Sequence, residues 1–384
     1  MLLSKGFEVE MYTGTPAGEV VGFSDKIVAT LEGFVREPDA RNVEYTTAPF
    51  TRYEHLLCEL LKPRVRLREY LQTLGDYTII PGSTLPLGGA QEFHRSDPHN
   101  PYHTYIENTY GTDVVTASIH INVGMSDPEQ LIRACRLIRL EAPLYLALTA
   151  SSPFFDGNIT GFHSTRWQLF PQTPAHVPLF ESHLHHIQWV EDQLKQGSMQ
   201  SVRHLWSSVR PNGDRRPYNL NRLELRICDL VSNPLHLLAV TALLESRLQQ
   251  MLQSPALDPL ESSQLAAATR SEDLVAIALE NEKAVAKNSL NAQLRHWETG
   301  SFITAKDWIE QIYADVEPFA KRAGINCFLT PLKQILREGN QAQQWLAQAQ
   351  TSTPTVVVQQ AIAQMHRQES LLAKDICPPA VAYA

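Results

Sequence analysis

The stretch SKGFEVEMYTG, residues 4–14, alternates apolar and acidic side chains near the start of the chain. Successive side chains of a strand point to opposite faces, so Glu8 and Glu10 share one face and the apolar residues between them share the other. The apolar face predicts a strand that packs on a core. The acidic face has two interpretations: the solvated side of an antiparallel sheet, or a cation site, because adjacent carboxylates repel unless positive charge lies between them.

Bulk composition narrows the class of protein. The chain has 384 residues, 43% of them hydrophobic and 19% charged, which is typical of a globular protein of one large or two ordinary domains. A net charge of −8 argues against a general nucleic-acid binder. We find no apolar run long enough for a transmembrane helix and no signal-peptide pattern. The five cysteines form no CxxC pair, which argues against a zinc site, and we expect a cytoplasmic location.

The first 230 residues predict a mixture of strands and helices. We expect a strand at 5–12, two more within 19–37, and a fourth at 42–49. A helix should begin at Thr51, where Thr51 and Glu54 have the spacing of a capping box, and Pro63 should bend or end it. Residues 81–101 are rich in Gly, Pro, Ser and Asp, and a loop of this length is often functional.

Further along, residues 114–125 predict a buried strand, and Asp127 should cap the next helix with Pro128 in its first turn. Residues 205–230 read as a hairpin, and the pattern is helical from Asn233 onward, ending in an amphipathic helix at 355–373. Strands first and helices last favour an α+β fold. We expect a catalytic core at 1–254 and a helical region at 255–384 packed on it, together one structural domain.

Several charged or imidazole side chains lie within apolar strand sequence, where an unpaired charge is costly. Besides the first pair they are Glu44, His120 and Glu224. Individually, His120 suits a hydrogen-bonded core residue, and Glu224 with Arg226 suits a structural ion pair. Together they predict a pocket for several cations. Arginines would supply fixed positive charge for phosphates or substrate carboxylates; the candidates are Arg166, Arg210 and Arg226.

Five segments resemble the glutamate–cysteine ligases and the related carboxylate–amine ligases, in the same order along the chain. They are GFEVEM (6–11), VEYTTAPFTRYEHLL (43–57), SIHINVGM (118–125), ALTASSPFFDGNITGFHSTRWQLFPQTP (147–174) and WSSVRPNGDRRPYNLNRLELRICD (206–229). The segment RSDPHNPYHTYIENTYG (95–111) and the compact length are most similar to the cyanobacterial group of these ligases.

The resemblance implies a glutamine-synthetase-like fold, in which a curved antiparallel sheet forms one wall of an active-site funnel and helices back it. It implies ATP-dependent ligation of the γ-carboxylate of L-glutamate to L-cysteine, through γ-glutamyl phosphate, as the first step of glutathione biosynthesis. Mg²⁺ would be the cofactor, with Mn²⁺ as the alternative because an imidazole ligand is unusual for Mg²⁺.

The resemblance also assigns roles to residues. The implied metal ligands are Glu8, Glu10, Glu44, His120 and Glu224, and His120 has phosphate binding as an alternative. Arg210 and Arg226 would hold the ATP phosphates or the glutamyl phosphate. The implied substrate-binding residues are Arg166, Thr160 and Asn122, with Arg166 contacting a substrate carboxylate.

Other functions stay open at this point. One is a carboxylate–amine ligase with a different acceptor, and another is a non-catalytic nucleotide-binding homologue. A metal-dependent hydrolase would need a base and a water site that no motif supplies. The expected partners are small molecules only, glutamate, cysteine and ATP, without nucleic acid or membrane, in a monomer or a homodimer.

Overall fold

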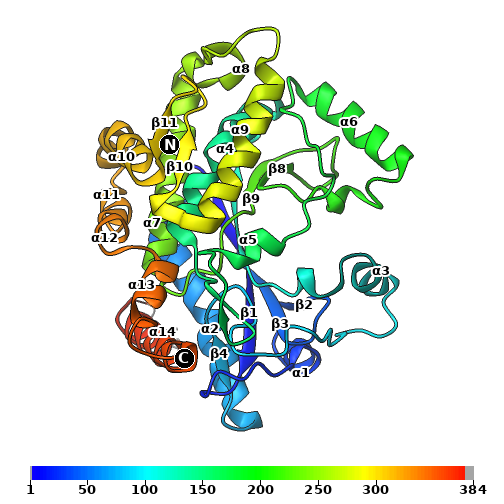
Figure 1. The fold of residues 1–384 in the computed structure, drawn as a ribbon, viewed down its shortest axis with the longest axis vertical. Coiled ribbons are helices and arrows are strands. Elements are labelled where there is room, and N and C mark those ends of the chain that lie inside the picture. The colour runs from blue at the N-terminus through cyan, green and yellow to red at the C-terminus, as the bar shows by residue number, and fades with distance from the viewer. Residues whose placement is uncertain (1, 377–384) are drawn as a thin grey trace, which may run out of the picture.

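A central antiparallel sheet organises the computed structural model, which describes residues 2–376 (Figure 1). Its strand order is β2-β3-β1-β5-β9-β8, and β4 pairs with β1 beside this path. The strands of this sheet are β1 (Lys5–Gly14), β2 (Phe34–Arg36), β3 (Asn42–Thr46), β4 (Thr78–Ile80), β5 (Ile119–Gly124), β8 (Val209–Asn212) and β9 (Arg222–Leu225). Two small hairpins lie outside it: β6 (Phe154–Phe155) with β7 (Asn158–Ile159), and β10 (Gln293–Arg295) with β11 (Phe302–Thr304).

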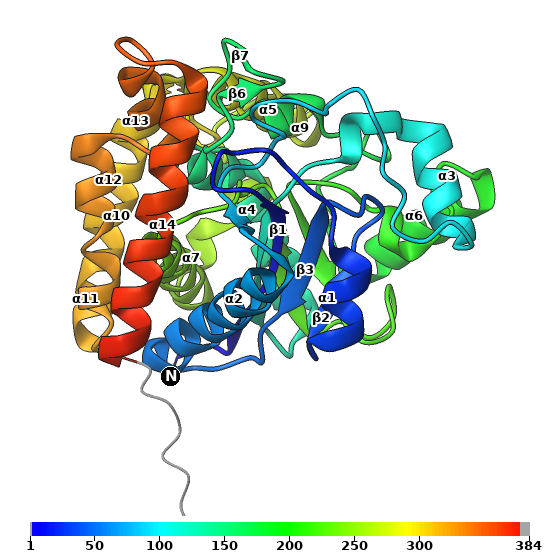
Figure 2. The same ribbon diagram turned by 90° about the horizontal axis from the view of Figure 1, so that it is seen from below.

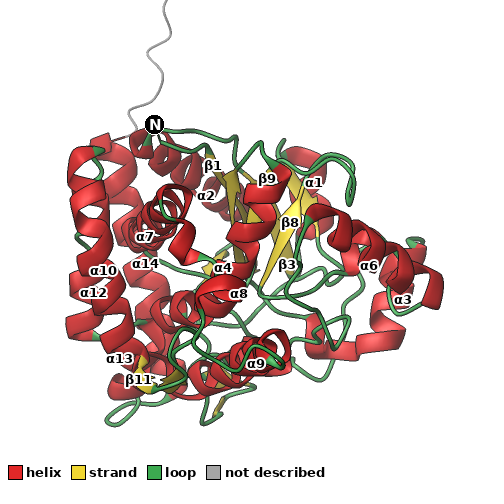
Figure 3. Ribbon diagram, turned by 90° about the horizontal axis from the view of Figure 1, so that it is seen from above, coloured by secondary structure: helices red, strands yellow, loops and turns green. Residues whose placement is uncertain are grey.

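Helices surround this sheet (Figure 3). Those of the first half are α1 (Ser24–Thr30), α2 (Tyr53–Leu74), α3 (Pro101–Tyr110), α4 (Pro128–Thr149), α5 (Thr165–Leu169), α6 (His183–Gln196) and α7 (Pro234–Gln253). Those of the second half are α8 (Pro259–Ser262), α9 (Arg270–Asn288), α10 (Ala305–Arg322), α11 (Asn326–Leu329), α12 (Leu332–Glu338), α13 (Gln341–Gln348) and α14 (Pro354–Ile376). No helix in the described part of the chain is both long and apolar enough to span a membrane.

The apolar face of β1 supports the core, as its alternation predicts. Phe7, Val9 and Met11 are buried, and α2 contacts β1 while α4 contacts β8 and β9. Helix α7 packs against both α2 and α4. Burying these side chains removes apolar area from water, which is the main favourable term in folding. The acidic side chains of β1 therefore lie on the opposite face of the sheet.

The C-terminal helices pack on the helices behind the sheet. Figure 2 shows α10–α14 on one side of α7 and α2, with α3 and α6 on the opposite side of the molecule. Helix α14 contacts α2 directly, and buried Glu369 accepts from Arg64 Nη1 at 3.1 Å and Arg68 Nη2 at 2.9 Å. One hydrophobic core contains side chains from before and after residue 254. The division at residue 254 stays a prediction.

Two local expectations were wrong. Residues 19–37 do not form two strands, because α1 occupies Ser24–Thr30 and only β2 is a strand. The apolar residues Phe23 and Ile27 are spaced by four, which suits one face of a helix rather than a strand. The capping box at Thr51 is also absent: α2 begins at Tyr53, and its N-cap residue Arg52 makes no side-chain capping bond.

A tertiary contact explains the late start of α2. Phe50 and Lys5 exchange two backbone hydrogen bonds of 2.8 Å, which keeps the chain extended up to Thr51. The Thr51 carbonyl then accepts from the buried Lys5 ammonium at 2.8 Å. The helix afterwards continues through Pro63 to Leu74 instead of ending there.

Other local predictions are confirmed. The Asp127 side chain caps α4 by accepting from the backbone N–H groups of Glu129 and Gln130. Strands β8 and β9 form the expected hairpin, residues 81–100 contain no helix or strand, and α14 is the expected terminal helix.

Candidate active site

A cavity of about 610 Å³ opens on the polar face of the sheet. Four glutamates line one wall: Glu8, Glu10, Glu37 and Glu44. Five arginines come from β8, β9 and the segments beside them: Arg203, Arg210, Arg216, Arg222 and Arg226. Arg36 of β2 and Arg166 of α5 line the cavity as well. Aromatic side chains of Tyr102, Phe170 and Trp206 complete the lining. By strand order β1, β2 and β3 lie toward one end of the sheet and β8 and β9 at the other, so the cavity has an acidic wall, which also contains Arg36, and a basic wall.

The register of the sheet brings the acidic residues together. Glu10 lies directly opposite Glu44 across β1 and β3, and Glu8 lies opposite His120 across β1 and β5. On the next strand, Glu224 faces Arg210 across β9 and β8. Like charges directly opposite in an antiparallel pair are destabilising. A cation bound between Glu10 and Glu44 would relieve this repulsion, so the pair is a candidate cation site.

Glu37, at the end of β2, joins that pair. One carboxylate oxygen from each of Glu10, Glu37 and Glu44 lies within 4.8 Å of the others. Burial, reinforced by the charges of Glu10 and Glu8, raises the pKa of Glu44 to about 8. Burial and the charges of Glu10 and Glu44 raise the pKa of Glu37 well above its usual range. Glu37 and Glu44 therefore retain protons near neutral pH unless a cation replaces them.

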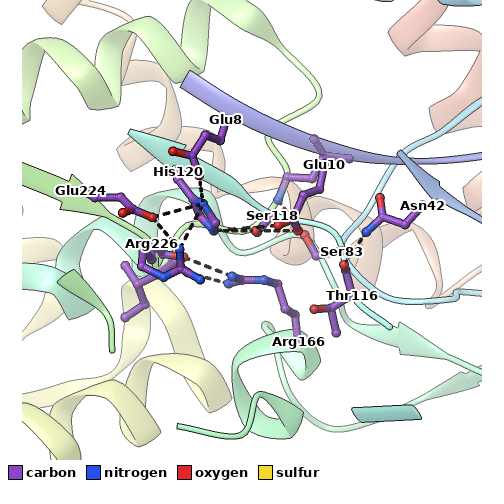
Figure 4. A network of polar contacts seen from close by, with 12 residues as sticks. Glu8, Glu10, Asn42, Ser83, Thr116, Ser118, His120, Arg166, Glu224 and Arg226 are labelled. Atoms are coloured by element: carbon purple, nitrogen blue, oxygen red, sulfur yellow. Dashed lines mark hydrogen bonds and ion pairs between the residues drawn. The ribbon is translucent and has the colours of Figure 1, made fainter. Parts of the chain in front are cut away.

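A second cluster lies beside the first and is centred on His120 (Figure 4). His120 Nδ1 is 2.8 Å from Glu8 Oε2, and its Nε2 is 3.1 Å from the Ser118 hydroxyl, which donates to Glu10 at 2.7 Å. The His120 side chain therefore links the two glutamates of β1. Burial and Glu224 oppose ionisation of Glu8, but its hydrogen bond with His120 and the Arg226 charge outweigh them, and the pKa of Glu8 is lowered.

Glu224 is fully buried and its oxygens are already in use. They accept from Arg210 at 2.7 and 3.0 Å, from Asn212 at 2.6 Å and from Arg226 at 2.5 Å. Burial opposes the Glu224 charge, but Arg210 and Arg226 outweigh it and hold the pKa of Glu224 well below its usual range. Glu224 also lies within 4.8 Å of ligand atoms of Glu8 and His120. The sequence suggested that Glu224 and Arg226 could form a structural ion pair, and Glu224 makes that contact in the structure.

The three predicted arginines differ in how many donors remain free. Arg210 spends its donors on Glu224 and on the carbonyl oxygens of Arg203 and Leu205, at 2.9 and 3.0 Å. Arg226 keeps a buried Nε without a hydrogen-bond partner. Arg166 also lines the cavity and keeps a buried Nε without a hydrogen-bond partner. Its other nitrogens donate to the carbonyl oxygens of Ile227 and Arg226, so it supports the segment that carries Arg226 (Figure 4).

The other two predicted substrate-binding residues lie elsewhere. The Thr160 hydroxyl is 2.7 Å from that of Thr165 at the start of α5, and Thr160 is not among the residues that line the cavity. Asn122 donates to Glu8 Oε1 at 3.1 Å and lines a neighbouring groove that it shares with Glu8.

Sequence reasoning missed Glu37 and four cavity arginines: Arg36, Arg203, Arg216 and Arg222. Glu37 is the last residue of the segment 19–37, for which two strands are predicted. The pairing of Val35 with Glu44 places Glu37 beside the strands that carry the other glutamates. A search for acidic residues at strand ends would have found it. Arg222 begins β9, and strand period places it on the face of Glu224, so this residue could have been found. Arg203 precedes β8 and Arg216 lies in the connection between β8 and β9, where strand period does not specify side-chain direction. Among the described residues, the His183, His185 and His186 cluster of α6 forms no candidate metal group.

Comparison with known proteins gives a family match over nearly the whole chain. The sequence model of the family described as glutamate-cysteine ligase family 2 matches residues 4–371. A candidate glutamate–cysteine ligase 2 from Rubrobacter xylanophilus is 28% identical over 283 residues, 71% of each chain. One from Sorangium cellulosum is 27% identical over 78% of each chain, and one from Salinispora tropica is 25% identical over 88% of each.

Two solved structures share the fold. The glutamate–cysteine ligase from Francisella tularensis, in complex with AMP, matches 96% of this chain and 89% of its own with a TM-score of 0.75 at 13% identity. A bifunctional glutathione synthetase from Pasteurella multocida matches 97% of this chain and 53% of its own with a TM-score of 0.74 at 14% identity. These likenesses confirm the predicted glutamine-synthetase-like α+β fold class.

Proposed function

The chain belongs to the glutamate-cysteine ligase family 2 and is a ligase, and from this premise we propose that it joins the γ-carboxylate of L-glutamate to the amine of L-cysteine at the expense of ATP. The γ-carboxylate attacks the γ-phosphoryl group of ATP to give γ-glutamyl phosphate and ADP. The amine of cysteine then displaces phosphate, giving γ-glutamylcysteine, the first product on the route to glutathione. The AMP found in the Francisella ligase supports a nucleotide in this fold.

The observation that carries the proposal is the opposition of the two walls. Phosphorylation of a carboxylate brings two anions together, so the site must supply positive charge and hold both reactants in line. The arginine wall supplies fixed cations, and the acidic wall suits bound metal cations. The chemistry needs no protein nucleophile, and electrostatic stabilisation carries the rate.

The residues fit Mg²⁺ at the Glu10, Glu37 and Glu44 carboxylates, because Mg²⁺ prefers oxygen ligands and a bound cation relieves the repulsion between them. Bound there, Mg²⁺ would neutralise phosphate charge. Glu8, His120 and Glu224 form the second candidate set, which its imidazole makes better suited to Mn²⁺. Arg226, with its free Nε, is the candidate for contact with the transferred phosphoryl group.

The experiment that tests this function is phosphate release from ATP with Mg²⁺ and L-glutamate, with each of a set of amino acids as acceptor. We expect release that rises only with L-cysteine or its close analogue 2-aminobutyrate, with γ-glutamylcysteine identified as the product. Release with a different amine would keep the mechanism and replace the acceptor. Absence of release with every acceptor, from protein shown to be folded, would overturn the proposal.

A further inference from the structure

The basic wall contains Arg216, an arginine for which we find no ion pair among the described residues. Arg216 lines the cavity, and its Nη1 is buried without a hydrogen-bond partner. The nearby carboxylate of Glu224 is already bonded to Arg210, Asn212 and Arg226. A buried guanidinium nitrogen left unpaired costs free energy unless a ligand completes it.

The electrostatic surroundings of Arg216 point to an anion. Burial lowers the pKa of Arg216, and among its charged neighbours only Glu224 opposes that effect, whereas Arg226, Arg203 and Arg222 reinforce it. Three arginines thus crowd Arg216, and the one nearby carboxylate, Glu224, is already paired with Arg210 and Arg226. Positive charge in excess of its protein partners, on the wall of a cavity, is the arrangement that binds carboxylate or phosphate oxygens.

The turn that carries Arg216 has a closed backbone. The N–H groups of Tyr218 and Asn219 both donate to the Arg215 carbonyl, at 2.9 and 2.8 Å. At Gly213 the two arms of the hairpin approach so closely that an added Cβ would lie 2.0 Å from the Asn219 carbonyl oxygen. The turn is therefore compact and closed by its own backbone.

Helix α6 then fixes where this turn lies. His183 Nε2 donates to the Pro217 carbonyl at 2.8 Å, and the Tyr218 hydroxyl donates to Glu191 Oε1 at 2.7 Å. The His183 backbone N–H in turn donates to both Glu129 carboxylate oxygens at the start of α4, at 3.1 and 3.2 Å. The first residue of the α6 histidine cluster is thus part of a chain of contacts that ends next to Arg216.

We propose that Arg216 is a substrate-binding residue whose Nη1 donates to an oxyanion of a substrate, a carboxylate or a phosphate, and that His183 positions it. This role rests on the proposed function. Arg210 already donates to Glu224 and to the carbonyl oxygens of Arg203 and Leu205, so Arg216 would make the anion contact instead.

The test compares Arg216→Gln with Arg215→Gln. Arg215 is the adjacent residue of the same type, but it is exposed, lies 5.9 Å from the Tyr218 ring and does not line the cavity. Binding of Mg·AMPPNP and of L-glutamate is measured separately by calorimetry, and KM is measured for ATP, glutamate and cysteine. We expect Arg216→Gln to weaken one ligand roughly 10- to 100-fold, the loss of a charge-assisted hydrogen bond, and Arg215→Gln to leave all of them unchanged.

The affected ligand identifies the anion: weaker AMPPNP indicates a phosphate, and weaker glutamate or a raised KM for cysteine indicates a carboxylate. His183→Gln should weaken the same ligand by a smaller factor. If Arg216→Gln does not fold, Arg216→Lys replaces it, with the same ligand weakened because a single ammonium cannot reproduce the guanidinium geometry. Identical values for the Arg216 and Arg215 variants would overturn the proposal. The two proposals can fail separately. If the wild-type protein shows no ligase turnover but Arg216→Gln still weakens AMPPNP or glutamate binding, the role of Arg216 is supported and the proposed function is not.

Discussion

At the scale of single residues, Glu44 has the most informative environment in the cavity. It faces Glu10 across the sheet, and its pKa of about 8 reflects burial and the charges of Glu10 and Glu8. A carboxyl group whose pKa is higher in the folded than in the unfolded protein contributes stability that is complete below about pH 4.5 and is lost as pH rises through about 8. The metal-free protein should therefore lose stability over that interval, and Mg²⁺ should restore it.

The first prediction concerns Mg²⁺ affinity. Because Mg²⁺ must displace the protons that Glu44 and Glu37 hold near neutral pH, its affinity should rise between pH 6.5 and 7.5 by up to about tenfold per pH unit for each proton released. Calorimetric titration in buffers of different ionisation enthalpy would count the released protons. Glu44→Gln should abolish Mg²⁺-dependent turnover, whereas the exposed Glu32→Gln should change neither quantity. A Mg²⁺ affinity that is independent of pH would contradict this cation site.

The second prediction separates Glu224 from the other glutamates. Glu224 is the buried anion for Arg210 and Arg226, so Glu224→Gln should destabilise the fold by about 3 kcal/mol as well as lower activity. Glu8→Gln changes a carboxylate that lines the cavity, and it should lower activity while changing stability much less. The midpoint of urea unfolding measures both effects. Equal stability of the two variants would show that the Glu224 ion pair is not structural.

At the scale of elements, the two long helices that back the sheet begin in different ways. Asp127 accepts from two backbone N–H groups at the start of α4, while Thr51 makes no capping bond for α2. The third prediction is that Asp127→Ala lowers stability by about 1 kcal/mol, and that Thr51→Ala changes it by less than about 0.5 kcal/mol. Thermal unfolding of both variants provides the measurement. A comparable loss for Thr51→Ala would mean that the threonine hydroxyl caps α2 in solution.

At the scale of the whole molecule, the C-terminal helix is joined to the core by a buried ion pair. Glu369 is 1% exposed and accepts from both Arg64 and Arg68 of α2. The fourth prediction is that Glu369→Gln costs about 3 kcal/mol, because both arginines would stay buried with reduced compensation. The matched control is Glu338→Gln, which alters an exposed pair with Arg337 and should cost less than about 0.5 kcal/mol. Similar urea midpoints for the two variants would indicate that α14 contributes little to the core.

Local sequence patterns were enough to predict a central strand, a helix start, the family and three cavity residues. The alternation in residues 5–14 specified the strand and its two faces, Asp127 and Pro128 specified the start of α4, and five ordered motifs indicated the family. The same patterns selected Glu8, Glu10 and Glu44, which line one cavity. These features are readable because side-chain period and helix capping depend on residues only a few positions apart.

Only the tertiary structure decided which partner each charged side chain has. Strand period gives the face of Glu224 but not that Arg210, Asn212 and Arg226 occupy its oxygens. Strand period could not predict that Glu37 lies beside Glu10, or that the Arg216 side chain lines the cavity. Those contacts depend on strand register and on tethers between residues distant in sequence, and local patterns carry no information about either.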